Sequence, residues 1–144
     1  MDSIFEKIQA VICPMVKMDA PLRIAIDGRC TAGKTTIADQ LQNAFECNVL
    51  HMDDFFLRPE QRTEERLRQP GGNVDWERFR EEVLFPLRLD VPFSYQPYDC
   101  HTQMLKEPVK VEPKRFTIVE GSYSCHPRLW NFYDLHIFLT ISPE

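Results

Sequence analysis

The stretch Gly28-Arg29-Cys30-Thr31-Ala32-Gly33-Lys34-Thr35 decides how this sequence is interpreted. It matches the pattern G-x-x-x-x-G-K-[ST], in which glycines let backbone N–H groups turn inward around phosphate oxygens. The apolar segment 22–27 predicts a buried strand before the motif, and segment 34–45 predicts a helix after it, with apolar residues at helical spacing. The N-terminus of that helix adds partial positive charge. The motif therefore predicts a phosphate-binding loop between a strand and a helix.

Each part of this loop has an expected role in holding a nucleoside triphosphate. Lys34 has the reach to contact the β- and γ-phosphates, and the Thr35 hydroxyl is a ligand for Mg²⁺. We therefore predict ATP and Mg²⁺ as cofactors. The predicted nucleotide contacts are Gly28, Arg29, Cys30, Thr31, Ala32, Gly33, Lys34, Thr35 and Thr36.

The composition limits the class of protein and its partners. Of the 144 residues, 43% are hydrophobic and 27% are charged, which predicts one globular domain over residues 1–144. A formal net charge of −5 without a basic tract argues against nucleic-acid binding, and the apolar runs are too short to cross a membrane. The five cysteines form no C-x-x-C pair, which favours a reducing compartment. These features predict a cytoplasmic protein with a small-molecule substrate, and they leave a homo-oligomer open.

The N-terminal segment, residues 1–20, is expected to be helical, and strand and helix patterns alternate along the rest of the chain. The N-terminal helix either covers the core or offers a face to a partner. The segment 91–115 contains four prolines and alternating valines, which favours a β-hairpin excursion outside the main sheet. The expected elements are helices at 1–18, 34–45, 58–68, 75–89 and 127–133, the excursion at 91–115, and strands at 22–27, 48–52, 116–121 and 135–141. This alternation predicts a mainly parallel α/β sheet that is covered on both faces.

Carboxylates follow the carboxyl ends of the expected strands, where ligands collect in such sheets. Asp27 precedes the loop, Asp53 and Asp54 follow the second strand, and Glu120 follows the third. A carboxylate near the γ-phosphate accepts a proton from an attacking hydroxyl, which is the role we predict for Asp53. Glu120 is predicted to hold Mg²⁺ together with Thr35, although a surface acid at a strand end is the alternative. Lys34, Asp53 and Glu120 are thus the predicted catalytic residues.

Four stretches resemble segments of the uridine kinase-like P-loop kinases, the group that includes uridine–cytidine kinases and nicotinamide riboside kinases. The run 50–56, Leu-His-Met-Asp-Asp-Phe-Phe, resembles their strand-end Asp-x-Phe-[Phe/Tyr] segment. Asn73-Val74-Asp75-Trp76 is similar to their Asn-Phe-Asp-His stretch, and Tyr98-Asp99-Cys100-His101 is similar to their Tyr-Asp-Phe…His segment. Ile118-Val119-Glu120-Gly121 resembles their Phe-Glu-Gly strand end. The matches run in order from about residue 22 to residue 142.

This resemblance implies a fold and a substrate site. The fold is a three-layer α/β/α sandwich with strands in the order 47–53, 116–120, 22–27, 135–141, and the hairpin covers the substrate. Asp53 maps onto the general base of the family, and Asp75 onto the residue that binds ribose hydroxyls. Asp75 also precedes a helix, so it suits an N-cap. The implied substrate contacts are Asp53, Phe56, Asp75, Tyr98 and His101.

The function implied by the resemblance is ATP-dependent phosphoryl transfer to a hydroxyl, with the 5′-hydroxyl of a nucleoside as the first candidate. Alternatives are a kinase for another small alcohol, such as nicotinamide riboside or pantothenate, and a nucleotide-binding module without catalysis. Kinases of this family continue into an arginine-bearing lid, a helix and a fifth strand, which the sequence to Glu144 does not include. We therefore expect this chain to bind nucleotide better than it transfers phosphate.

The remaining polar residues of the expected strands and helices receive structural interpretations. His51 and His136 lie in strand patterns and are expected to be structural histidines with satisfied hydrogen bonds. Four arginines alternate with acids in segment 58–68 and are expected to form mostly a solvated helix face; they are Arg58, Arg62, Arg66 and Arg68.

Overall fold

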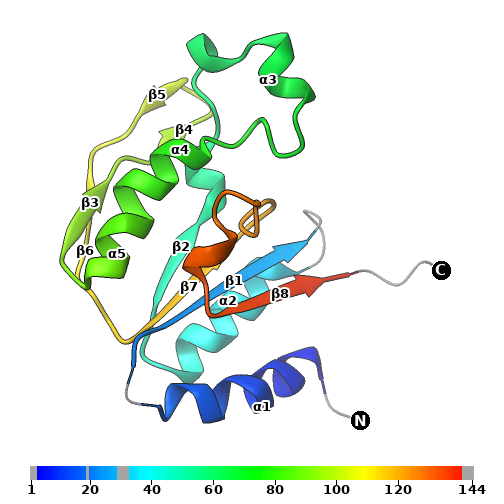
Figure 1. The fold of residues 1–144 in the computed structure, drawn as a ribbon, viewed down its shortest axis with the longest axis vertical. Coiled ribbons are helices and arrows are strands. Elements are labelled where there is room, and N and C mark those ends of the chain that lie inside the picture. Colours follow the sequence, from blue (N-terminus) through cyan, green and yellow to red (C-terminus); the bar gives the residue numbers. More distant parts are fainter. Residues whose placement is uncertain (1–2, 19, 29–32, 141–144) are drawn as a thin grey trace.

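A computed structural model of the chain describes residues 3–18, 20–28 and 33–140. Its centre is a parallel sheet of four strands in the order β2 (Asn48–His51), β7 (Phe116–Glu120), β1 (Leu22–Gly28), β8 (Leu135–Leu139) (Figure 1). This order confirms the one implied by the family resemblance. The predicted nucleotide contacts at 29–32, which are Arg29, Cys30, Thr31 and Ala32, lie outside the described residues.

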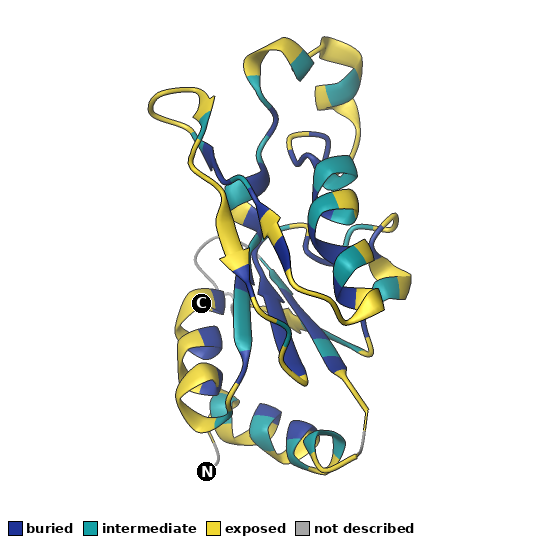
Figure 2. Cartoon of the chain, turned by 90° about the vertical axis from the view of Figure 1, so that its left-hand side faces the viewer, coloured by how far each residue is buried: buried dark blue, intermediate teal, exposed yellow. Residues whose placement is uncertain are grey.

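Side chains alternate between the two faces of the sheet, as strand geometry requires. On β1, Ile24 and Ile26 pack into the apolar cluster beneath α1 (Ile4–Val16) and α2 (Lys34–Ala44). Ala25 packs into the cluster on the opposite face, which contains Phe55 and Phe79. Figure 2 shows the buried strands enclosed by helices whose outer surfaces are exposed. The predicted sheet covered on both faces is therefore confirmed.

The helix predicted over 75–89 is present as one continuous run. It consists of α4 (Trp76–Phe79), a π-helical turn over Arg80–Leu84 and α5 (Phe85–Leu89). Pro86 lacks a backbone N–H, so the i to i−4 ladder is interrupted where the wider turn precedes it. This run lies against the excursion, and together they cover the sheet face opposite α1 and α2 (Figure 1).

The excursion at 91–115 lies outside the main sheet, as predicted, but it forms two short antiparallel pairs. β3 (Phe93–Tyr95) pairs with β6 (Val109–Val111), and β4 (Tyr98–Asp99) pairs with β5 (Met104–Leu105). Proline has no N–H for a ladder, so the prolines of this segment keep the paired stretches short.

Two predicted helices are shorter than expected. Segment 58–68 is not one helix: a 3₁₀ turn covers Pro59–Gln61, and α3 covers only Glu64–Arg68. The Thr63 side chain accepts a hydrogen bond from the Arg66 N–H and starts α3 there, because an N-cap residue is itself non-helical. Segment 127–133 contains only a 3₁₀ turn at Trp130–Phe132. In the parts of the chain that the structure describes, no helix is both long and apolar enough to cross a membrane.

The packing of α1 leads to a test of its role. Ile12 is fully buried in the cluster under α1, whereas Val11 is 54% exposed. Ile12→Val is expected to lower the free energy of unfolding by about 0.5–1.5 kcal/mol, because one buried methylene is lost. Val11→Ala should change it by less than about 0.5 kcal/mol. Urea denaturation of both variants measures this, and equal effects would mean that α1 is not core cover.

Candidate active site

The two glycines of the motif lie where the chain leaves the sheet and enters α2. Gly28 ends β1 with φ at +143°, and a Cβ there would lie 2.5 Å from the Leu139 carbonyl oxygen. Gly33 has φ at +88° and directly precedes α2, so a side chain at either place would be strained. Lys34, only 6% exposed, donates a hydrogen bond from Nζ to the Gly28 carbonyl at 2.9 Å. The lysine thus folds back toward the glycine-rich segment, where a phosphate chain is expected.

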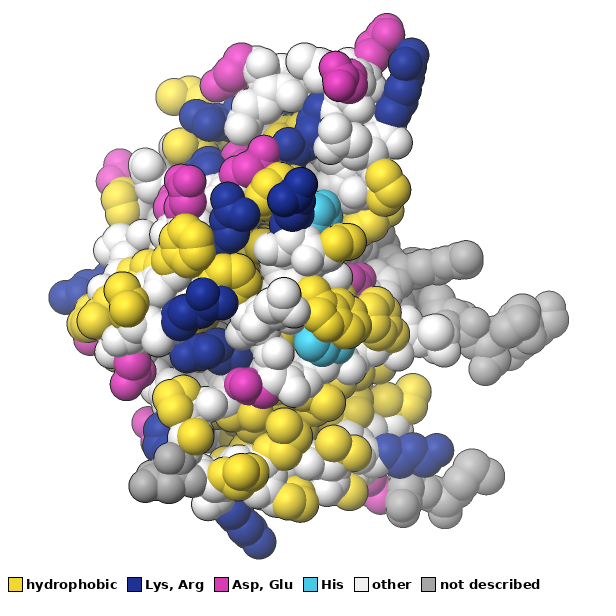
Figure 3. All heavy atoms as spheres, viewed as in Figure 1, with side chains coloured by type: hydrophobic (Ala, Val, Ile, Leu, Met, Phe, Trp, Pro, Cys, Tyr) yellow, Lys and Arg dark blue, Asp and Glu magenta, His cyan; other side chains and the backbone are white. Residues whose placement is uncertain are grey.

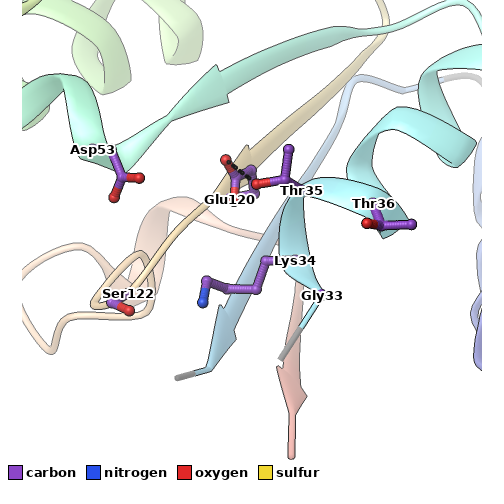
Figure 4. Close-up of a pocket in the computed structure, with 7 residues that line it drawn as sticks. All are labelled: Gly33, Lys34, Thr35, Thr36, Asp53, Glu120 and Ser122. Carbon is purple, nitrogen blue, oxygen red and sulfur yellow. Dashed lines mark hydrogen bonds between the residues drawn. The ribbon is translucent and has the colours of Figure 1, made fainter. Parts of the chain in front are cut away.

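A cavity of about 320 Å³ opens at the N-terminus of α2 (Figure 4). It receives side chains from α2, from the turn after β2 and from the end of β7, and Figure 4 shows that they converge from three sides. Its lining consists of Gly33, Lys34, Thr35, Thr36, Asp53, Glu120 and Ser122. The structure therefore brings together the predicted lysine, threonine and two carboxylates in one place.

Hard oxygen ligands for a cation lie on one side of this cavity. The Thr35 hydroxyl oxygen lies 3.5 Å from Glu120 Oε1, and Glu120 is 4% exposed. Hydroxyl and carboxylate oxygens suit Mg²⁺, which usually takes one or two protein ligands and completes its shell with water and phosphate oxygens. Among the described residues no group of three or more His, Cys, Asp or Glu side chains is placed to hold a metal. The donor set thus fits a cation that a bound nucleotide helps to hold.

His51 lies behind this site and is hydrogen-bonded within the protein, as expected of a structural histidine, and its partner is the cavity residue Glu120. Its Nδ1 lies 2.6 Å from Glu120 Oε1, because β2 and β7 pair with His51 opposite Glu120. The hydrogen bond to the Glu120 carboxylate raises the pKa of His51, and it outweighs the burial that would lower it. His136 is also a structural histidine. Its Nε2 forms a hydrogen bond with the Trp130 carbonyl, and its ring stacks on the Trp130 indole with the ring centroids 3.5 Å apart.

Asp53 and Asp54 have different surroundings, although they are neighbours. The strand ends at His51, so both lie on a 3₁₀ turn over Met52–Phe55 rather than at the strand end. Asp53 is exposed and lines the cavity. Asp54 is half-buried, and burial raises the pKa of its carboxyl. The turn therefore gives the cavity one carboxylate and directs the other elsewhere.

The other residues expected to contact the acceptor do not line this cavity in the described chain. Asp75 is 1% exposed: its Oδ1 accepts from the Arg78 N–H, which confirms the N-cap, and its Oδ2 accepts from Gln61 Nε2. Both carboxylate oxygens of Asp75 are thus engaged within the protein. The Phe56 side chain packs against the apolar cluster that contains Phe55.

The two hairpin residues that resemble base contacts differ in exposure. Tyr98 is 3% exposed, and its hydroxyl accepts a hydrogen bond from Arg62 Nη2. His101 is exposed between β4 and β5, and its N–H donates to the Asp99 side chain. The Tyr98 ring is buried and offers no exposed face to a nucleobase, whereas the His101 side chain is exposed.

The prediction of a mostly solvated arginine face holds for Arg62 and Arg68, which are exposed, and is wrong for Arg66, whose side chain is 17% exposed. Arg62 donates to the Leu57 carbonyl as well as to Tyr98. Arg66 forms two hydrogen bonds with the Glu77 carboxylate, at 2.6 and 2.7 Å. Arg68 stays solvated beside Glu64. Most of this segment therefore faces water, and Arg66 is the arginine that ties α3 to Glu77 of α4.

Asp27 positions the loop that follows β7. Its carboxylate accepts hydrogen bonds from the backbone N–H groups of Gly28, Tyr123 and Cys125. Ser122, which the sequence analysis did not single out, lines the cavity and donates to the Gly28 carbonyl. Its position two residues after Glu120 was the available signal.

Known proteins resemble this chain in structure and not in sequence. No protein-family model matches the sequence, and no curated protein matches it. A solved structure from Bacillus stearothermophilus, provisionally assigned as a uridine kinase, superimposes with a TM-score of 0.80 at 22% identity, over 96% of this chain and 80% of that one.

The chain has the fold of the P-loop kinases.

Two further neighbours with this kinase fold have different assignments. A protein from Silicibacter sp. TM1040, provisionally assigned as a fructose transport system kinase, has a TM-score of 0.73 at 20% identity, over 99% of this chain and 76% of that one. A D-glycerate 3-kinase from Cryptococcus neoformans var. grubii has a TM-score of 0.59 at 17% identity, over 85% and 53%. The neighbours are uridine kinase-like and related P-loop kinases, and their assigned acceptors differ.

Proposed function

We propose that this protein is an ATP-dependent kinase that transfers the γ-phosphoryl group to a hydroxyl of a small molecule. The observation that carries this proposal is the cavity at the start of α2, where a lysine, a threonine and two carboxylates converge. A module that only binds nucleotide has no use for an exposed carboxylate such as Asp53 opposite the phosphate cradle. The folds of the neighbouring kinases support the same class.

Each residue of the cavity has a role in the proposed transfer. The Lys34 ammonium would leave the Gly28 carbonyl and contact the β- and γ-phosphates. Asp53 would accept the proton of the acceptor hydroxyl. The oxygen of that hydroxyl would bond to the γ-phosphorus as the bond between the γ-phosphorus and the ADP oxygen breaks. Thr35 and Glu120 would hold Mg²⁺, which supplies charge neutralisation on the phosphate oxygens when bound. His51, bonded to Glu120, would keep that carboxylate in place.

The acceptor is proposed to be a nucleoside, through its 5′-hydroxyl, on the strength of the ordered motif matches. Another small alcohol, a sugar or a hydroxy acid for instance, is the second candidate. It is favoured by the buried Tyr98 ring and by the occupied carboxylate of Asp75, which leave fewer groups for a base and a ribose.

A panel assay would test this function. ATP consumption is measured with nucleosides, sugars, glycerate and pantothenate as acceptors, and phosphorus NMR identifies each product. We expect one acceptor class to give a phosphorylated product. ATP binding without transfer to any acceptor would favour the binding module.

Glu120→Gln leads to a prediction for the metal. Glutamine keeps an oxygen for the hydrogen bond to His51 but removes the negative charge, so Mg²⁺ is held less tightly. The Mg²⁺ concentration for half-maximal ATP binding should rise roughly tenfold. Calorimetry across a Mg²⁺ series measures it, with the exposed Glu46→Gln as the matched control. Identical Mg²⁺ dependence in both variants would contradict the metal role of Glu120.

A further inference from the structure

Cationic side chains surround Trp76, which begins α4. The His126 ring stacks on the indole, with centroids 5.6 Å apart and planes at 20°. The guanidinium carbons of Arg66, Arg80 and Arg128 lie 5.8, 5.0 and 5.5 Å from the indole centroid. We call these five residues the Trp76 cluster. It concentrates positive charge in a chain whose net charge is −5.

The positive charge of the cluster is only partly compensated. Arg66 is paired with the Glu77 carboxylate, and that hydrogen bond lowers the pKa of Glu77. Within the described residues, neither Arg80 nor Arg128 has a carboxylate within ion-pair distance. Arg66 thus has two acidic neighbours, Glu77 and Asp75, whereas Arg80 and Arg128 form no ion pair with the described residues.

Hydrogen-bond donors in the cluster are also unsatisfied or free. Arg80 Nε is buried and has no hydrogen-bond partner within the described structure. His126 Nδ1 accepts the Arg128 N–H at 3.0 Å, which assigns the proton of the neutral ring to Nε2. Burial and the neighbouring Arg66 and Arg128 lower the pKa of His126, so the ring is neutral at pH 7. The cluster therefore offers N–H donors that suit an oxyanion.

Space for a ligand adjoins the cluster. A second cavity, of about 480 Å³, includes one residue of the Trp76 cluster, His126, in its lining; the others that line it are Asp27, Gly28, Ser122, Tyr123, Cys125, Pro127 and Phe138. It is distinct from the first cavity, with which it shares only Ser122 among the described lining residues. On the face shown in Figure 3, Lys and Arg side chains gather beside a histidine and hydrophobic side chains. A molecule with an anionic group at the cluster has room here for a small organic body.

We propose that the Trp76 cluster binds the phosphate group of a small phosphate monoester, at a site separate from the triphosphate cavity. A phosphate monoester is largely a dianion near pH 7.5, because its second pKa is about 6, and its two negative charges complement the guanidinium groups of Arg80 and Arg128. Guanidinium groups pair with phosphate oxygens in a planar, two-pronged geometry that a lysine does not offer.

The experiment follows the Trp76 indole N–H by NMR while phosphate compounds are added. Saturating Mg²⁺ and a non-hydrolysable ATP analogue occupy the first cavity, and the Trp130→Phe variant assigns the indole resonance. The probes are inorganic phosphate and glucose 6-phosphate, and uncharged glucose serves as the negative control. Arg80→Gln and Arg128→Gln are compared with Arg88→Gln, a matched control outside the cluster whose guanidinium carbon lies 4.0 Å from the Phe132 ring centroid.

We expect at least one phosphate probe, but not glucose, to shift the Trp76 resonance. Arg80→Gln and Arg128→Gln should each weaken that binding roughly tenfold or more, because each removes a charged hydrogen bond. Arg88→Gln should bind like the parent. The Arg128 side chain is exposed, so its variant keeps the test valid even if Arg80→Gln fails to fold. No shift with either probe, or parent-like affinity in Arg128→Gln, would overturn the proposal.

Discussion

Asp53→Asn is expected to lower the turnover number by roughly 10²-fold or more in a phosphoryl-transfer assay with an acceptor from the panel. Asparagine has nearly the same size and leaves the turn at Met52–Phe55 intact, but it cannot accept the proton of the attacking hydroxyl. ATP affinity should stay close to that of the parent, because Asp53 faces the acceptor side of the cavity. The loss should therefore appear in kcat.

Asp54→Asn is the matched control for this prediction. It makes the same chemical change one residue away, at a side chain that is half-buried and does not line the cavity. Its turnover should be much closer to that of the parent. If Asp54→Asn lost more activity than Asp53→Asn, the role of general base would be assigned to Asp54.

Lys34→Ala is expected to weaken Mg-ATP binding by between roughly tenfold and a hundredfold. The ammonium is the one cationic side chain among the described residues that line the first cavity. Charged hydrogen bonds contribute roughly 1.5–3 kcal/mol, which corresponds to this range of affinity. The backbone N–H groups at the start of α2 remain, so some affinity should survive.

Calorimetry of Mg-ATP binding measures the effect of Lys34→Ala, and the exposed Lys7→Ala on α1 is the control. The control removes an equal charge and should bind like the parent, which separates a local contact from a change in net charge. An unchanged dissociation constant in Lys34→Ala would show that the first cavity is not the triphosphate site.

Local signals were sufficient for the order of strands and helices. Apolar periodicity located the four strands of the sheet and the helix over 75–89, because burial on one or two faces leaves a repeating pattern in the sequence. Periodicity could not foresee that segment 58–68 divides at Thr63, since a cap and a packed arginine decide where α3 begins. The order of the strands came from the family resemblance, as no local pattern contains it.

In the candidate site, too, the sequence indicated the residues and the tertiary structure determined their partners. The Asp27 carboxylate was expected at the ligand edge, and it lies there, but its oxygens hold three backbone N–H groups of the surrounding loops. Asp75 was weighed as a cap and as a substrate ligand, two compatible roles, and the structure shows the cap and a second bond from Gln61. In both cases the residue type was informative, while its partners come from other segments of the chain.

The sequence by itself determined the phosphate-binding loop, because that loop is built from eight contiguous residues whose glycines and helix start act locally. Only the tertiary structure decided which acids and histidines meet there. His51 and Glu120 are 69 residues apart and touch because β2 and β7 pair in one particular register. The Trp76 cluster likewise joins α3, α4 and the loop after β7. Contacts of this kind depend on packing between distant segments, which no local pattern of residues encodes.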